Sequence, residues 1–160
     1  MKKIQDPIQL LRSEHDLALE HVDCMELAAS ELNTPRHTEA LETLRHGLDY
    51  LVREVRAHGK TEEEILYPAL GRHVPKQIIE SLLDEHKELW WKMALLDDVL
   101  RRKQPPPNEV RWHVVALIDS LRRHIDRENN MIFLMTAQML SEREYGDLAE
   151  ALARTATARS

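Results

Sequence analysis

Apolar residues recur along most of the chain with the seven-residue repeat of packed helices. The repeat covers four stretches, at residues 7–32, 35–67, 75–103 and 108–139. Apolar positions three and four residues apart form one face of a helix. Short connections between such helices favour an all-α fold, an antiparallel up-down-up-down four-helix bundle. We expect the bundle to occupy residues 1–140 and to be followed by a short C-terminal helical segment and a frayed tail over residues 141–160.

Capping residues mark the ends of these stretches. Asp6 and Thr34 each place an oxygen-bearing side chain before a proline, which suits the first helical turn. A chain of 160 residues is long enough for one domain with a substantial core. The remaining boundaries are marked by Pro75, Asn108 and a capping box formed by Ser141 and Glu144.

Six ionisable residues share the periodicity of the apolar seam: His15, His58, Glu62, His86, His124 and Glu128. At a rise of about 1.5 Å per residue, the four histidines fall in one layer of an up-down bundle. Buried carboxylates without a cation would cost several kcal/mol each, and no Arg or Lys lies on the same stripe at that level. The pattern therefore predicts a metal site inside the bundle.

Part of this pattern is duplicated. The segment HGKTEEEILYP at residues 58–68 aligns with HIDRENNMIFL at residues 124–134. In each copy a His and a Glu four residues apart point the same way on a helix, so they aim an imidazole and a carboxylate at one point. The Glu-x-x-His motif of ferritin-type carboxylate bundles and the His-Glu-x-x-His motif of zinc proteases do not fit this order and spacing.

Composition limits which binding partners and which cell compartment we expect. Glycine is rare, aromatic residues make up 4% of the chain, and the formal net charge is −6. Basic residues are scattered among acidic ones, which argues against nucleic acid as a partner. Neither a signal peptide nor a run of membrane-spanning length is present, so we expect a cytoplasmic protein without membrane contact. The single Cys24 excludes an internal disulfide and is expected to be packed.

Several polar residues near the seam are expected to lie outside the metal site. We interpret Glu63 and Glu64 as facing water. Glu54 and Ser120 lie one turn before His58 and His124 and are candidates for orienting them. The remaining histidines, off the seam or too far along the axis, are His21, His37, His46, His73 and His113.

These motifs together resemble hemerythrin-like proteins of the HHE cation-binding type, over about residues 6–139. The resemblance fixes ligand type, order and spacing in all four helices. The residues that carry it are Glu14-His15, His58-x-x-x-Glu62-Glu63-x-x-Leu66-Tyr67-Pro68, Glu85-His86 and His124-Ile125-x-x-Glu128.

By this resemblance, two iron ions would form an oxo- or hydroxo-bridged pair. His15 and His58 would hold one iron, His86 and His124 the other, and both glutamates would bridge them. Mixed imidazole and carboxylate ligation suits non-haem iron, although affinity alone also permits Zn, Mn or Co. The implied ligand is a small diatomic molecule, O2 or NO, or peroxide.

The sequence departs from the oxygen-carrying hemerythrins, which place a second histidine on the third helix. Here those positions hold Trp90 and Leu82, so both irons would keep open coordination positions. Trp90 is expected either to line the ligand pocket or to fill core volume. In some iron-sensing relatives the residue after the second-helix His is acidic, whereas this chain has Gly59.

The missing histidine favours sensing, detoxification or iron handling over bulk oxygen transport. The leading alternative is a di-iron protein that repairs nitrosative damage to iron-sulfur clusters. Such relatives usually carry an additional cysteine-bearing amino-terminal domain, which these 160 residues do not include. A third interpretation is a metal-stabilised interaction module, in which the metal maintains the fold and a partner binds the surface. Whether the protein is an enzyme and how it oligomerises stay open.

Overall fold

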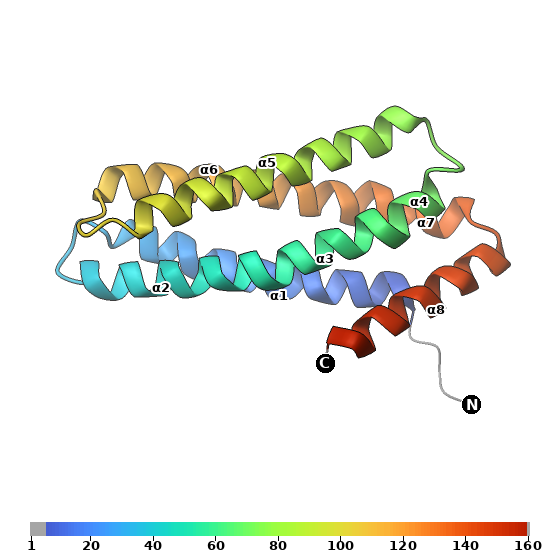
Figure 1. Cartoon of the computed structure of the whole chain (residues 1–160), viewed down its shortest axis with the longest axis horizontal. Coiled ribbons are helices and arrows are strands. Elements are labelled where there is room, and N and C mark those ends of the chain that lie inside the picture. The colour runs from blue at the N-terminus through green and yellow to red at the C-terminus, as the bar shows by residue number, and fades with distance from the viewer. Residues whose placement is uncertain (1–5, 160) are drawn as a thin grey trace.

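The computed structural model describes residues 6–159, with side chains through residue 155, and within that range the chain contains helices and turns but no strand. Four long rods form an antiparallel bundle, and a fifth helix packs across one end (Figure 1). Four rods therefore follow the stretches predicted from the apolar repeat. The first rod is α1 (Pro7–Ser30), and the third is α5 (Lys76–Leu100). The second rod joins α2 (His37–Tyr50), η1 (Leu51–Val55), α3 (Arg56–Thr61), η2 (Glu62–Leu66) and α4 (Tyr67–Leu70). The fourth joins α6 (Pro107–Arg127), η3 (Glu128–Ile132) and α7 (Phe133–Met139).

One predicted cap, Asp6, is observed, whereas two others, Thr34 and Asn108, do not cap the helices as predicted. The Asp6 side chain accepts a hydrogen bond from the Ile8 amide at 3.0 Å, as expected for a cap. The second rod begins at His37, because Thr34 and the residues after it form a turn in which the Arg36 amide donates to Thr34 Oγ1. The fourth rod already begins at Pro107, so the prediction that Asn108 caps it is wrong.

Three segments of the second and fourth rods are π-helical. The segments η2 and η3 each begin at one of the two seam glutamates, Glu62 and Glu128, so the duplication extends to the backbone. A π-helical turn holds an extra residue relative to an α-helical one, and such turns are frequent at functional sites. The third such segment, η1, lies one turn before His58.

The apolar core is divided in two by the layer of seam histidines. One cluster fills the end of the bundle where α1 joins α2 and α5 joins α6, and it includes Val22, Leu44 and Leu96. The other cluster, which includes Leu11 and Phe133, lies beyond the histidines. Apolar residues therefore flank the polar layer on both sides.

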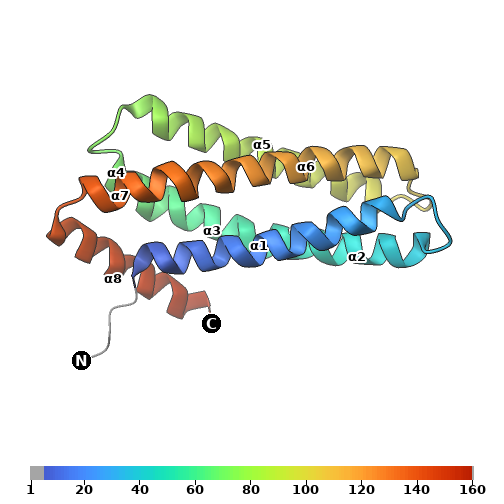
Figure 2. The same ribbon diagram turned by 180° about the vertical axis from the view of Figure 1, so that it is seen from behind.

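Helix α8 (Glu142–Arg159) packs beside the start of α1 (Figure 2). The predicted capping box is present, because the Ser141 amide donates to Glu144 Oε2 at 2.9 Å and the Glu144 amide donates to Ser141 Oγ at 3.3 Å. The helix continues to Arg159, so the predicted short C-terminal helical segment is longer than expected. Buried Leu148 and Leu152 hold the helix against the second core cluster.

The helices of residues 6–159 include none with the length and apolar content needed to cross a membrane.

Candidate metal centre

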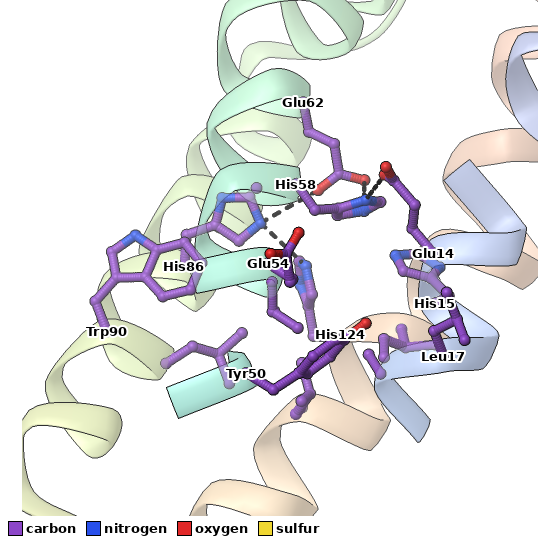
Figure 3. A pocket seen from close by; sticks show the side chains of 16 residues that line it. Glu14, His15, Leu17, Tyr50, Glu54, His58, Glu62, His86, Trp90 and His124 are labelled. Carbon is purple, nitrogen blue, oxygen red and sulfur yellow. Dashed lines mark hydrogen bonds and ion pairs between the residues drawn. The ribbon is translucent and has the colours of Figure 1, made fainter. Parts of the chain in front are cut away.

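The six polar residues of the seam meet in the middle of the bundle. Each is at most 6% exposed. Figure 3 shows His58, His86 and His124 turned toward a common space, with Glu62 above His58 and His15 on the facing helix. They come from all four rods: His15 from α1, His58 from α3, Glu62 from η2, His86 from α5, His124 from α6 and Glu128 from η3.

Their donor atoms form two overlapping groups. One group contains His15 and His58, the other contains His86 and His124, and both contain Glu62 and Glu128. Within each group the donor atoms lie within 4.8 Å of one another. Each group therefore has two imidazoles and two carboxylates at distances that a cation can span.

One oxygen of each glutamate in the site lacks a hydrogen-bond partner within residues 6–155. Among the described residues, Glu62 Oε2 and Glu128 Oε2 are the buried side-chain oxygens without a hydrogen-bond partner. Glu128 Oε2 lies 3.2 Å from the Nε2 atoms of both His15 and His124, but neither contact has hydrogen-bond geometry. Buried carboxylate oxygens are normally satisfied. The donor set thus fits a bound metal cation, which would be the missing partner of both oxygens.

The Nε2 atoms of the histidines face this space because their Nδ1 atoms are hydrogen-bonded on the outside. His58 Nδ1 donates to Glu14 Oε2 at 2.6 Å, and His124 Nδ1 donates to Glu85 Oε2 at 2.9 Å. Such hydrogen bonds fix the imidazole tautomer and raise the basicity of the nitrogen that faces a metal. The other two pairs are His86 Nδ1 with Glu63 Oε1 at 2.7 Å and His15 Nδ1 with Asn129 Oδ1 at 3.0 Å.

These supporting residues correct two expectations. Glu63 does not simply face water, because its carboxylate reaches across to His86. Ser120 does not contact His124; its hydroxyl lies among the side chains of Lys92, Glu88 and Arg123. The sequence did contain a signal, since each supporting residue directly precedes or follows a seam residue: Glu14, Glu63, Glu85 and Asn129.

Tyr67 is a further member of the site that the sequence interpretation gave no role. The side chain is 1% exposed, and its hydroxyl donates to Glu128 Oε1 at 2.6 Å. Burial and the neighbouring carboxylates Glu62 and Glu128 raise the pKa of the Tyr67 phenol far above its ordinary value. The phenol therefore stays protonated and holds one oxygen of Glu128, while the other faces the histidines.

The carboxylates also control the protonation of two imidazoles in the absence of a metal. Burial favours the neutral form of His58, but the charge of Glu62 and the hydrogen bonds to Glu14 and Glu62 outweigh it and raise its pKa to about 10. Burial is likewise outweighed at His124, whose pKa is raised to about 10 by Glu128 and Glu85. These protons neutralise part of the buried negative charge, a task that a metal cation would take over.

Trp90 packs over Gly59, where any side chain would crowd the indole. A Cβ atom at Gly59 would lie 2.9 Å from Trp90 Cζ2 and 3.1 Å from His86 Cε1. The indole lies 5.3 Å from the His86 ring, centroid to centroid. Trp90 also lines the cavity beside the histidines, as one of the two sequence interpretations expected.

Three of the remaining histidines make contacts away from the metal centre. His21 stacks on Tyr50, His37 Nδ1 donates to the Leu32 carbonyl, and His73 pairs with Glu144. Cys24 is exposed, so the expectation that it is packed is wrong.

Comparison with known proteins agrees with this architecture. Iron-sulfur cluster repair protein YtfE of Salmonella typhimurium is 27% identical over 127 residues, which are 74% of this chain and 55% of that protein. The corresponding protein of Salmonella paratyphi B is similar to the same extent. The chain spans about half the length of these relatives. Residues 6–136 match the hemerythrin HHE cation-binding domain, so the chain belongs to the hemerythrin HHE family.

Proposed function

We propose that the protein is a non-haem di-iron protein that binds O2, NO or peroxide at an iron pair and acts in sensing, detoxification or iron handling. The observation that carries this proposal is the pair of donor groups that share two buried glutamates. Family membership and the resemblance to a cluster repair protein favour iron over other metals. Zn and Mn are the substitutes that the same donors would accept.

We assign the ligands of the two ions from the two donor groups described above. His15 and His58 would hold one ion, His86 and His124 the other, and Glu62 and Glu128 would contact both. When bound, an iron pair supplies redox chemistry and coordination positions for a small ligand. The protein's own residues exclude bulk water, because all six side chains are buried, and they orient the imidazoles through the outer hydrogen bonds.

Open coordination positions favour reaction or sensing over reversible oxygen storage. The positions one turn to either side of His86 hold Leu82 and Trp90, which offer no imidazole. Each donor group therefore contains two imidazoles in the described part of the chain. An ion held by this set keeps room for an exogenous ligand.

The test combines metal content with optical spectra. Elemental analysis of the iron-loaded chain should give two irons, and the spectrum of the reduced protein should change on exposure to NO or O2. His58→Ala should lower the iron content, whereas the control His46→Ala, at an exposed position away from the site, should not. Equal iron in both variants would refute the ligand assignment. A stable, fully reversible oxygen spectrum would instead indicate an oxygen carrier.

A second candidate function is repair of iron-sulfur clusters, because the relatives described above carry that name. Incubation of the iron-loaded chain with an NO-damaged iron-sulfur enzyme distinguishes it from the first candidate. Recovery of the damaged enzyme's activity, absent with the His58→Ala variant, would favour repair. Spectral response to NO without such recovery would favour sensing or detoxification.

A further inference from the structure

A cavity of about 290 Å³ adjoins the candidate metal centre. Five of the six proposed ligands border it, but Glu128 does not. Most of its other lining residues lie on the side of the histidines where α1 joins α2, so the cavity extends in that direction. It reaches about one turn along α1, α5 and α6, and about two turns along the second rod, as far as Tyr50. Figure 3 shows Trp90, Tyr50 and Leu17 around this space.

The wall of the cavity beyond the histidines is mostly apolar. Trp90 stays in that wall because Gly59 leaves room for the indole against α3. Concave sites with apolar walls and a few convergent polar groups are typical of small-molecule binding. The apolar wall residues are Ala18, Val55, Leu89, Trp90, Leu121 and Ile125.

The volume exceeds the need of a diatomic ligand. A cavity of about 150 Å³ lined by apolar side chains is enough to bind benzene, and a water molecule takes about 30 Å³ of liquid volume. The cavity beside the histidines, at about 290 Å³, is therefore large enough for an organic molecule with several carbon atoms.

The carboxylates around the cavity favour a ligand that donates a hydrogen bond. Three carboxylates border it: Glu62 at the inner end, and Glu14 and Glu54 beside it. Glu62 is fully buried, so its charge is poorly screened by solvent. A ligand hydroxyl can donate a hydrogen bond to these carboxylates, whereas a ligand carboxylate has no hydrogen to donate.

We propose that this cavity binds a neutral organic molecule with an apolar body of about one to two benzene rings in volume. One hydroxyl or hydroperoxyl group of the molecule points toward the inner end of the cavity, where Glu62 lies, and its body lies against Val55, Trp90 and Leu121. This inference deepens the proposed function by naming the class of molecule that reaches the metal centre. The binding site itself is formed by the chain.

The first experiment measures binding of 2-phenyl-2-propanol to the purified full chain, freed of metal by a chelator, by calorimetry. The matched anion, 2-methyl-2-phenylpropanoate, has a similar apolar body and should bind at least about tenfold more weakly, which corresponds to about 1.4 kcal/mol. Equal or tighter binding of the carboxylate would overturn the proposal. Absence of saturable binding of the alcohol would overturn it as well.

A competition experiment tests the hydroxyl and the hydroperoxyl group of the ligand separately. Cumene hydroperoxide has the same apolar body as the alcohol, and in the zinc-loaded protein it meets a metal without redox chemistry. Displacement of the alcohol at similar concentrations would support a site that accepts both groups. Failure of the hydroperoxide to displace the alcohol would overturn the hydroperoxyl part of the proposal and leave an alcohol site.

Two variants locate the binding. Val55→Phe fills the cavity from η1 and should weaken alcohol binding at least about tenfold, because one methylene in an apolar pocket already changes discrimination about 10- to 200-fold. Val115→Phe adds the same volume at an exposed position of α6 that does not line the cavity and should bind as the wild type does. Should Val55→Phe prevent folding, Ala18→Leu fills the same space from α1. Wild-type affinity in a folded cavity-filling variant would refute the location.

The response to NO distinguishes this inference from the proposed function. Val55 is not a proposed ligand, so the Val55→Phe variant should retain two irons and respond to NO. Iron binding and NO response without alcohol binding would overturn the cavity proposal alone. Saturable alcohol binding that Val55→Phe weakens, in a chain that binds no iron, would overturn the proposed function alone.

Discussion

Single residues of this site link each rod to the next through a hydrogen bond to an imidazole. Glu14 precedes His15 on α1 but bonds to His58 on α3, while Glu85 precedes His86 on α5 but bonds to His124 on α6. Each helix thus contributes both a proposed ligand and a support for a ligand of its neighbour. This arrangement ties the orientation of every imidazole to the packing of two helices.

Removing one support should weaken metal binding without removing a ligand. We expect Glu85→Gln to lower metal affinity about 10- to 100-fold, because it weakens the hydrogen bond that orients His124. The measurement is competition with a chelator of known affinity. The control is Glu80→Gln on the same helix, since Glu80 pairs with Lys76 on the surface. Equal affinities of the two variants would contradict a supporting role for Glu85.

The Tyr67 hydroxyl can be tested by removing it alone. Tyr67→Phe leaves Glu128 Oε1 buried without its donor, which should lower the free energy of unfolding by about 1–3 kcal/mol. Urea denaturation measures the change. Tyr145→Phe removes a hydroxyl that donates to Asp6 near the surface, and its cost should be smaller, about 1 kcal/mol or less. A larger loss for Tyr145→Phe would refute the role assigned to Tyr67.

At the scale of elements, the apolar repeat was enough to predict the four rods and the seam residues that meet between them. The π-helical turns were not predictable, because a His and a Glu four residues apart fit an ordinary α-helix equally well. Glu63 was misplaced for a related reason. Helical periodicity places it off the seam, but its side chain crosses to the neighbouring helix and reaches His86. The cavity depends on side-chain volumes in three dimensions, which periodicity does not contain.

At Gly59 in α3, the packing of neighbouring side chains favours glycine although helix propensity favours alanine. Replacing a helical glycine by alanine ordinarily stabilises a helix by about 1 kcal/mol. Gly59→Ala should instead destabilise the protein by about 1–3 kcal/mol, because the new Cβ would collide with Trp90 and His86. The comparison is Gly146→Ala in α8, where no atom lies within 4 Å and stabilisation is expected. Thermal denaturation of both variants measures the sign, and a stabilising Gly59→Ala would show that Trp90 moves freely.

At the scale of the whole molecule, the proposed metal ions would join all four rods at one level. The metal-free protein must neutralise the same buried carboxylates with protons on His58 and His124. Stability therefore depends on pH differently in the two states.

Chelation should expose this dependence. The pKa values of His58 and His124 rise from 6.5 to about 10 on folding, so their contribution is complete below pH 6.5 and is lost as pH rises toward 10. We expect the urea midpoint of chelated protein to fall between pH 7 and 10. The midpoint of metal-loaded protein should change less, because its imidazoles are already neutral. A midpoint of chelated protein that rises with pH would contradict the assignment.

Helix α8 lies beyond the residues that match the family, yet Leu148 and Leu152 pack in the same apolar cluster as Tyr67 and Phe133. In a chain truncated after residue 140, part of this cluster would be exposed to solvent. Solvent would then have a shorter path to the phenol that holds Glu128. We expect such a truncation to aggregate and to lose bound metal faster under dialysis, although every proposed ligand would remain in the shortened chain.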